Sequence, residues 1–283
     1  MLADVVPYLV CPVCRGSLEL LPGTVRCASG HAFDVARQGY VSLLTGSRSP
    51  GTADTPQMVA ARDAFLAAGH YAPLAAELAK LCSGAAVTVE AGAGTGYYLA
   101  RALGPGGVGI AFDVSKHAVK RAARAHERIG AFVGDVWQPL PIASGVADVV
   151  LDVFAPRNGS EFARVLRAGG RLVVVTPAVR HLEPLVSGLG LLTVDADKQD
   201  RVARGLPEFT LVEQRELAYD LELGAEEIAA VVGMGPSAWH LEEDVLRARI
   251  SGLLREKNLR KMSTHVAFQL SIFGVVTRSR SVP

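Results

Sequence analysis

Three cysteines and one histidine near the start of the chain have the residue types and the spacing of metal ligands. They follow the pattern Cys-x₂-Cys-x₁₂-Cys-x₃-His and are Cys11, Cys14, Cys27 and His31. Thiolates and an imidazole suit tetrahedral Zn²⁺, and four protein ligands leave no open position for a substrate. The pattern therefore predicts one structural zinc ion.

Disulfides or unrelated thiols are the alternative interpretation of these cysteines. The chain has four cysteines, and three of them lie within its first 27 residues, in the contexts CPVC and CASGH. The short turn between Cys11 and Cys14 presents both sulfurs to one ion, which favours zinc. The fourth, Cys82, lies in an apolar helical stretch, and we expect it to be an ordinary buried thiol.

A glycine-rich segment after a predicted strand could hold a small ligand. Residues 90–96 read Glu-Ala-Gly-Ala-Gly-Thr-Gly, and a helix is expected to begin at Tyr97. Closely spaced glycines at a strand-to-helix turn let the backbone approach a ligand at the carboxyl edge of a sheet. A dinucleotide fingerprint needs its third glycine at position 97, so Gly96 comes one residue too early. The acid Glu90 also fits a cationic ligand better than a pyrophosphate.

Two more acids follow the next two predicted strands. Asp113 lies 23 residues beyond Glu90 and can accept both ribose hydroxyl protons. Asp135 can accept a hydrogen bond from the exocyclic amine of adenine. One strand-terminal acid could simply cap a helix, but three behind a glycine turn favour S-adenosyl-L-methionine, which carries an ammonium and a sulfonium. The predicted cofactor-binding residues are Glu90, Gly92, Gly94, Gly96, Tyr97, Tyr98, Asp113, Asp135 and Val136.

A parallel sheet is needed to bring these acids to one edge. Short apolar runs alternate with helical segments from residue 85 onward, at 85–90, 107–114, 130–136, 147–154 and 170–176. Such alternation is typical of an α/β fold whose parallel sheet is covered on both faces. After a loop-rich stretch, the pattern predicts a final pair of strands over 209–223 and 264–277, with helices over 225–232 and 242–254 between them.

The chain divides into three predicted parts. Residues 1–45 read as short strands and turns around the metal, and residues 46–84 as a linker and two helices broken near Gly69–Pro73. Residues 85–283 form the α/β domain. With 283 residues, 49% of them hydrophobic, the chain can bury one large core with a small appendage.

Charge and hydropathy leave several partners open. The net charge of +1 neither requires nor excludes a nucleic acid. No apolar run is long enough for a membrane span and no secretory leader is evident, so we expect a cytoplasmic protein, in agreement with reduced cysteines. Two stretches are locally basic, with a solvated helix face as the alternative interpretation. They comprise Lys116, Lys120, Arg121, Arg124 and Arg128, and Arg255, Lys257, Arg260 and Lys261.

Several segments together resemble one family. They are the zinc cluster with HAFDVARQGYVSLL behind it, ARDAFLAAGHYAPL, EAGAGTGYY, FDVSKHAVKRAA, VFAPRNGSEFARVLRAGG, TPAVRHL and MGPSAWH. From Cys11 to about His240 the chain resembles the bacterial 23S rRNA guanine-N1 methyltransferases of the RlmA type. The resemblance implies a class I (Rossmann-like) methyltransferase with a mostly parallel seven-stranded sheet, preceded by a small zinc-binding ribbon domain that recognises RNA.

The resemblance also implies a reaction. A methyl group would pass from S-adenosyl-L-methionine to N1 of a guanine in the hairpin 35 loop of domain II of 23S rRNA. The VFAPRN segment favours the branch that acts at nucleotide 748, which is linked to tylosin and mycinamycin resistance, over the sister branch at 745. The implied partner is 23S rRNA, and the homodimer of the family would widen the cleft for it.

Candidate reaction residues follow the fourth predicted strand. Guanine N1 holds a proton, so the site must favour its removal as the methyl group moves. Asp152 stands where class I methyltransferases face the transferred methyl group, although a general-base role is not carried over from the family and a structural cap is the alternative. Phe154 and Pro156 follow it, and an aromatic ring there could stack on a flipped base. The candidate RNA contacts are Arg180, His181, Trp239 and His240.

Two other classes of protein share part of this pattern. A small-molecule methyltransferase of a biosynthetic pathway would have the same cofactor residues but no need of a Cys₃His ribbon. A non-enzymatic RNA- or antibiotic-binding protein with this fold would be free to lose Glu90, Asp113 and Asp135.

Overall fold

A long mixed sheet forms the centre of the protein. The computed structural model describes residues 1–46, 53–191, 204–235 and 242–276. The sheet has eight strands in the order β10-β11-β9-β8-β5-β6-β7-β4. The strands from β4 to β9 are parallel to their neighbours, and β11 is antiparallel to both β9 and β10. The bounds of the first five in chain order are β4 Val41–Ser42, β5 Val87–Ala91, β6 Val108–Asp113, β7 Ile129–Val133 and β8 Ala147–Val153. The last three are β9 Leu166–Pro177, β10 Phe209–Leu223 and β11 Met262–Val275.

The observed sheet has one strand more than the seven that were predicted. The end of the N-terminal segment adds β4 beside β7, with Val41 opposite Phe132, and Leu43 N donates to the Val133 oxygen at 3.0 Å. This strand covers the backbone edge that β7 would otherwise expose. A strand of two residues from another part of the chain leaves no periodic signal, so the sequence pattern missed it.

The N-terminal ribbon is a small antiparallel sheet docked on the main body. Its strands are β1 Leu18–Leu21, β2 Thr24–Cys27 and β3 Ala32–Asp34. The short helix α1 (Leu2–Val5) packs on β7 so closely that a Cβ on Gly130 would lie 2.0 Å from a Val5 methyl carbon. Arg15 Nη1 also donates to the Leu140 oxygen at 2.9 Å. Ribbon and body therefore share one hydrophobic core.

Helices cover the sheet as the alternation of the sequence predicts. Thr55 caps α2, since Met58 N donates to Thr55 Oγ1 at 3.2 Å, and Pro56 takes the first helical position. The helices are α2 Pro56–Ala67, α3 Ala72–Leu81, α4 Tyr97–Ala102, α5 Lys116–Ala122, α6 Gly159–Val165, α7 Leu185–Leu189, α9 Ala225–Gly233 and α10 Glu243–Glu256. The predicted break between α2 and α3 and the predicted final strand pair with its two helices are confirmed.

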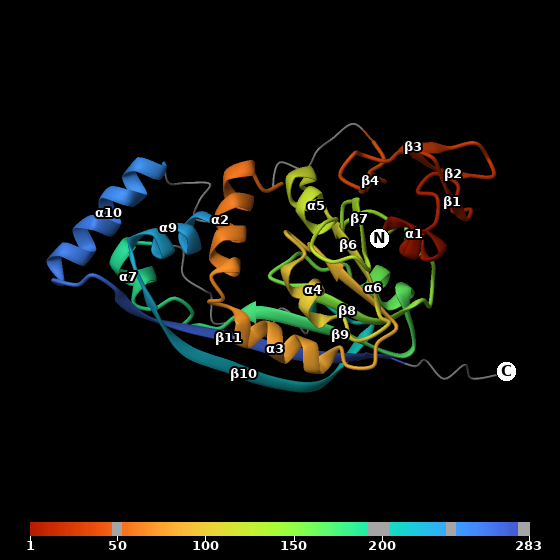
Figure 1. Cartoon of the computed structure of the whole chain (residues 1–283). Helices are drawn as coiled ribbons and strands as arrows, with labels where there is room; N and C mark the ends of the chain where they lie inside the picture. The colour runs from red at the N-terminus through yellow and green to blue at the C-terminus, as the bar shows by residue number, and fades with distance from the viewer. Residues whose placement is uncertain (47–52, 192–203, 236–241, 277–283) are drawn as a thin grey trace.

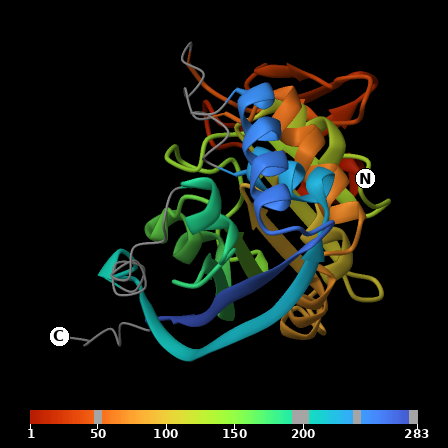
Figure 2. The ribbon, with the colours of Figure 1, turned by 90° about the vertical axis from the view of Figure 1, so that its left-hand side faces the viewer.

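The elements are arranged along a line from the ribbon to α10. Figure 1 shows the ribbon at one end of the molecule, α10 at the other, and α5 and α2 between them. Figure 2 shows β10 and β11 bending together beneath the helices. Helix α9 packs against both α2 and α10, so the two C-terminal helices continue from α2. Within the described residues, no helix is both long and apolar enough to cross a lipid bilayer.

Candidate functional site

The four predicted metal ligands converge. Their ligand atoms all lie within 4.8 Å of one another. Cys14 Sγ is 3.7 Å from Cys27 Sγ, and His31 Nδ1 is 3.6 Å from Cys11 Sγ and 3.3 Å from Cys27 Sγ. Tetrahedral zinc with Zn–S bonds of about 2.3 Å separates its sulfurs by about 3.8 Å. The sulfur separation therefore fits a zinc ion and is far too long for a disulfide.

Tight turns hold these ligands in place. Cys11 N donates to the Gly16 oxygen at 2.7 Å, and Arg15 N donates to the Cys11 oxygen at 2.8 Å. Arg15 adopts the left-handed conformation at φ +63°, which closes the turn after Cys14. The backbone N–H of Gly16 is the main cause that lowers the pKa of the Cys14 thiol to about 6, so the thiolate form that zinc needs is favoured.

The glycine turn has the shape that a cofactor cradle requires. Gly92, Gly94 and Gly96 have φ values of +61°, +54° and +76°, where other residues are strained. A Cβ on Gly92 would lie 2.6 Å from Ala155 Cβ, and one on Gly96 would lie 3.0 Å from Ala122 Cα. Only glycine fits at these approaches, so the turn between β5 and α4 can pack closely against Ala155 and Ala122.

Glu90 lies beneath this turn, at the end of β5. Its side chain is buried, and Leu99 N donates to Oε2 at 3.1 Å, so the carboxylate holds the first turn of α4. Burial raises the pKa of Glu90 to about 8, the Leu99 N–H opposes this rise, and the carboxylates of Asp113 and Asp152 add to it. A cationic ligand at this edge would stabilise the ionised form.

The other predicted cofactor residues line the same edge. Asp113 Oδ2 accepts a hydrogen bond from Gly94 N at 2.9 Å, and Oδ1 accepts one from Ser115 N at 2.8 Å. Asp135 Oδ1 accepts one from Trp137 N at 3.0 Å. The backbone oxygen of Val136 accepts one from Asn158 Nδ2 at 2.8 Å. Both Asp side chains thus shape their turns, and their lone pairs beyond these bonds can still accept from a ligand. Tyr97 and Tyr98 lie on α4 with their rings 5.1 Å apart.

Asp152 is the most unusual acid of the site. It is the second-to-last residue of β8, and its side chain is fully buried. Arg157 Nη1 lies 3.1 Å from Oδ1, and Oδ2 has no hydrogen-bond partner among the described residues. Burial raises the pKa of Asp152 to about 8, although Arg157 lowers it. A carboxyl group whose pKa is raised by burial and that has one oxygen free can take up a proton.

Phe154 is held in a strained backbone conformation beside this acid. Its φ is +59°, which is uncommon for a bulky residue, and 42% of the side chain is exposed. Its ring lies 5.6 Å from that of Phe268, which also contacts Tyr71 and His181. An exposed ring on an aromatic base can stack on a nucleobase. Pro156 is also exposed.

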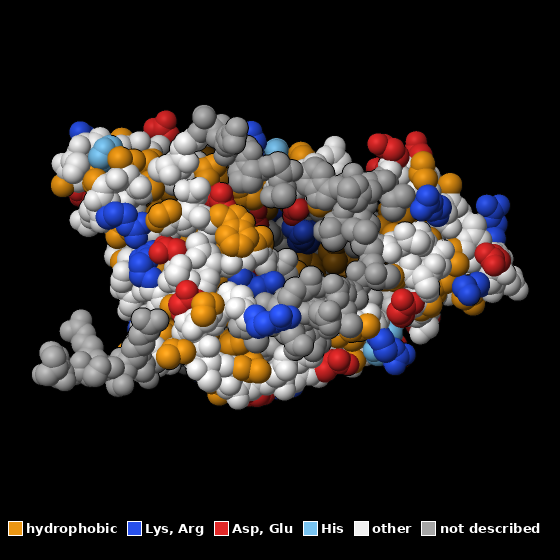
Figure 3. Space-filling view, turned by 180° about the vertical axis from the view of Figure 1, so that it is seen from behind, with side chains coloured by type: hydrophobic (Ala, Val, Ile, Leu, Met, Phe, Trp, Pro, Cys, Tyr) orange, Lys and Arg blue, Asp and Glu red, His pale blue; other side chains and the backbone are white. Residues whose placement is uncertain are grey.

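The candidate RNA contacts have different surroundings. Arg180 is exposed. His181 is half-buried: its Nδ1 lies 3.3 Å from Ala267 N, which donates to it, and its Nε2 lies 3.3 Å from Tyr71 Oη. Trp239 and His240 lie outside the described residues. Figure 3 shows a hollow on the face opposite to that of Figure 1, with hydrophobic side chains on its floor and Lys or Arg at its edge.

Two arginines at this edge were missed by sequence reasoning. Arg157 pairs with Asp152, and Arg62 on α2 pairs with Asp54 while its Nη2 donates to the Met234 oxygen at 3.0 Å. A Cβ on Gly94 would lie 3.3 Å from Arg62 Nη1, so this guanidinium lies against the glycine turn. Charged residues on amphipathic helices and in loops are common, and no spacing distinguishes these two.

Replacing Gly92 by Ala should weaken binding of S-adenosylhomocysteine by about tenfold or more. The left-handed conformation costs an alanine about 1–2 kcal/mol and its Cβ would meet Ala155 Cβ at 2.6 Å, so the turn should move away from the conformation that fits the cofactor. Isothermal titration calorimetry measures the affinity. Gly106→Ala is the matched control, because Gly106 has φ +76° with open space around its Cβ position. Equal affinities in the two variants would contradict the cradle.

Comparisons with known proteins agree with this geometry. The family profile described as RlmA, N-terminal, matches residues 9–46, and a profile described as Methyltransferase domain matches residues 89–174. A protein of Streptomyces fradiae named 23S rRNA (guanine(748)-N(1))-methyltransferase is 48% identical over 264 residues, covering 89% of this chain and 93% of the relative. The chain belongs to the RlmA-type 23S rRNA guanine-N1 methyltransferases. A relative from Micromonospora griseorubida, named for guanine-N1 methylation of 23S rRNA, is also 48% identical, over 88% of this chain and 93% of its own.

Family membership decides between the classes of protein that the sequence left open. A member of the RlmA-type family is an S-adenosyl-L-methionine-dependent enzyme that acts on 23S rRNA, which excludes both the small-molecule methyltransferase and the non-enzymatic binding protein. The Cys₃His cluster is the zinc-ribbon site of this family.

Proposed function

We propose that the protein methylates N1 of guanine 748 in the hairpin 35 loop of 23S rRNA and contributes to resistance to tylosin-type macrolides. The assignment to guanine 748 rests on the 48% identity to the Streptomyces fradiae relative, whose name specifies guanine 748. The VFAPRN segment, which holds Phe154 and Arg157 beside Asp152, supports the same branch. The homodimer implied by the resemblance stays a prediction.

The cofactor fits the residues at the carboxyl edge of β5, β6 and β7. The glycine turn, where a Cβ has no room, would accommodate the methionine part, and Asp113 and Asp135 would bind the ribose and the adenine. Arg62, which lies against Gly94, would hold the methionine carboxylate in place of its present partner Asp54. Bound S-adenosyl-L-methionine supplies an electrophilic methyl group.

The guanine would be prepared by Asp152 and Phe154. The exposed ring of Phe154 stacks on the flipped base and fixes its plane. The free Oδ2 of Asp152 accepts the N1 proton, while Arg157 holds Oδ1 and so fixes the orientation of the carboxyl group. Positioning in a site that excludes water contributes most of the rate, and proton removal adds to it.

Primer extension tests this proposal directly. Naked 23S rRNA is incubated with the protein and labelled S-adenosyl-L-methionine, and reverse transcription then maps the product. N1-methylguanine blocks base pairing, so we expect a stop at guanine 748 that disappears when this guanine is replaced by adenine. A stop at 745, or label that enters RNA elsewhere, would overturn the assignment of the nucleotide.

A tylosin susceptibility test addresses the resistance role. Expression in a sensitive host should raise the inhibitory concentration of tylosin, and the same host with an adenine at position 748 should show no increase. Unchanged susceptibility despite complete methylation would separate the resistance role from the enzymatic one.

A further inference from the structure

The basic stretch of α5 faces a hollow. A cavity of about 660 Å³ lies between α2, α4 and α5. Its basic lining residues are Arg101, His117, Lys120, Arg121 and Arg124, and Asp63 is the one acid among its lining residues. Thr95 of the glycine segment also lines it, which places the hollow next to the cofactor cradle.

Most of this positive charge is uncompensated. Asp63 is bound to Arg121. Among the described residues, Lys120, Arg124 and Arg101 have no acidic partner. Arg101 Nη1 donates instead to the backbone carbonyl oxygen of Tyr97 at 3.3 Å. Lys120 lies on α5 and Arg124 in the turn that follows it, and both line the hollow. The hollow is thus a site of concentrated positive charge.

Tyr97 adds a second feature to the same hollow. Its side chain is more than nine-tenths buried, and its hydroxyl has no hydrogen-bond partner among the described residues. The guanidinium carbon of Arg101 lies 3.7 Å from the centre of the Tyr97 ring, so the ring fixes this cation at the wall of the hollow. Fixed cations with spare donors are the groups that bind phosphate oxygens.

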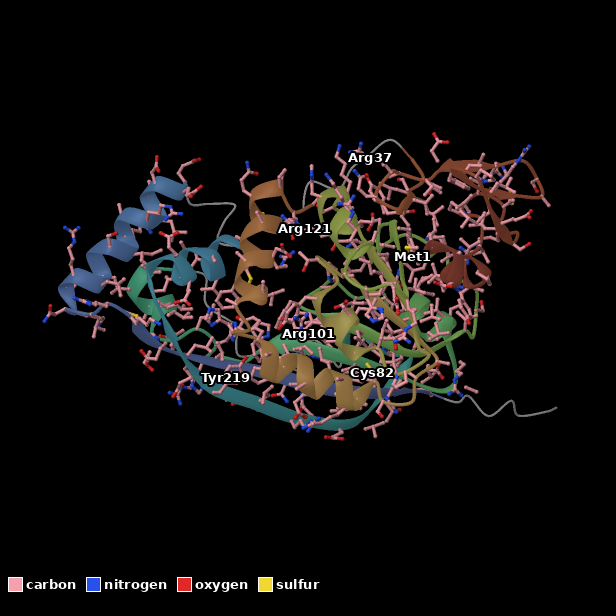
Figure 4. All side chains as sticks on the ribbon, in the orientation of Figure 1. Met1, Arg37, Cys82, Arg101, Arg121 and Tyr219 are labelled. Carbon is pink, nitrogen blue, oxygen red and sulfur yellow. The ribbon has the colours of Figure 1, made fainter. Side chains whose placement is uncertain are left out.

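The position of the hollow relates it to the ribbon. In the view of Figure 4, Arg37 of the ribbon, Arg121 and Arg101 follow one another from top to bottom. All three side chains are exposed. A substrate that contacts both the ribbon and the hollow would extend past these side chains, and a phosphate backbone would follow such a row of cations.

We propose that the hollow between α2, α4 and α5 binds the phosphate backbone of the rRNA substrate outside the loop that carries the target guanine. This inference rests on the proposed function for the identity of the RNA. The positive charge of the hollow is complementary to a polyanion such as RNA, and its open shape suits a strand that passes through it. The contacts supply affinity and carry no sequence information.

The second basic stretch offers a matched control. Arg255, Lys257 and Arg260 are exposed at and after the end of α10 and do not line this hollow. Figure 1 places α10 at the end of the molecule opposite the ribbon. A triple variant there removes the same number of positive charges from the protein, so it reports the effect of net charge alone.

The experiment compares Arg101→Gln/Lys120→Gln/Arg124→Gln with Arg255→Gln/Lys257→Gln/Arg260→Gln. Methylation kinetics on 23S rRNA are measured over a range of salt concentrations. For the first variant we expect the KM for RNA to rise about tenfold or more and the slope of log affinity against log salt to fall by about three, with kcat maintained. The control should behave like the unmodified protein.

Three further readouts keep the test independent of other failures. Affinity for S-adenosylhomocysteine, zinc content and the position of the primer-extension stop should be the same in both variants, because none of them depends on backbone phosphates. A Lys120→Gln/Arg124→Gln double variant, which leaves the Arg101–Tyr97 contact intact, should show about two thirds of the change in salt slope. If the triple variant of the hollow and the control variant had the same KM and the same salt slope, the proposal would be overturned, whichever guanine the enzyme methylates.

Discussion

Replacing Asp152 by Asn should slow methyl transfer to guanine by about 10²–10⁴-fold, the range that a positioned general base contributes. The amide keeps the size of the side chain in its buried place at the end of β8, so we expect the fold and the affinity for S-adenosylhomocysteine to remain. Single-turnover methylation with labelled cofactor measures the step. Near-normal turnover with intact cofactor binding would leave Asp152 a structural acid.

The pH dependence of the unmodified enzyme also tests whether Asp152 accepts the proton, because it predicts the direction in which kcat/KM changes. The carboxylate is the form that accepts a proton, and burial raises the pKa of Asp152 to about 8. The value of kcat/KM should therefore rise as the pH increases through about 8 and then level off. Asp152→Asn should lose this rise. A rise that persists in the variant belongs to another group, such as guanine N1 itself.

Arg157 should act on this profile through Asp152. Because the guanidinium favours the ionised carboxylate, Arg157→Gln should raise the pKa further and shift the rise in kcat/KM to higher pH, while Arg157→Lys should restore much of it. A structural role alone would lower activity at every pH by the same factor. The direction of the shift thus distinguishes a positioning residue from a packing residue.

The elements that local pattern determines were predictable. The strand β10 has the bounds 209–223 that alternation indicates, and β11 begins two residues before the predicted start, because Met262 pairs with Leu223. The metal ligands were also predictable, since ligand type and spacing within a short ribbon leave few arrangements. In these cases the information lies within one continuous segment.

The rest depends on contacts between distant segments. The strained backbone of Phe154 leaves no mark in the local pattern, and its ring contacts Phe268, which comes from β11 at the far end of the chain. The free oxygen of Asp152 and the contact between Arg62 and Gly94 require coordinates, because they concern which atoms lack partners and which approach closely. A basic segment likewise becomes a candidate binding site only when the structure shows that α2, α4 and α5 enclose a hollow beside it.

The zinc ion should stabilise more than the ribbon that contains it. Val25 and Cys27 of the ribbon belong to the same hydrophobic core as Val89 and Ile110 of the main sheet. The strand β4, which covers the edge of β7, follows the ribbon directly. Loss of the metal would therefore release the ribbon, uncover an edge strand and remove part of the core.

Replacing Cys27 by Ser should remove the zinc and lower the free energy of unfolding by several kcal/mol, because structural zinc contributes roughly 10 kcal/mol or more of binding free energy in isolated zinc modules. Zinc analysis and urea unfolding measure both effects. Cys82→Ser is the matched control: Cys82 is equally buried and burial raises its pKa to about 12, but it lies outside the cluster. It should keep one zinc per chain and lose little stability. If Cys27→Ser retained its zinc, or if both variants lost the same stability, the ion would not be the element that holds ribbon and body together.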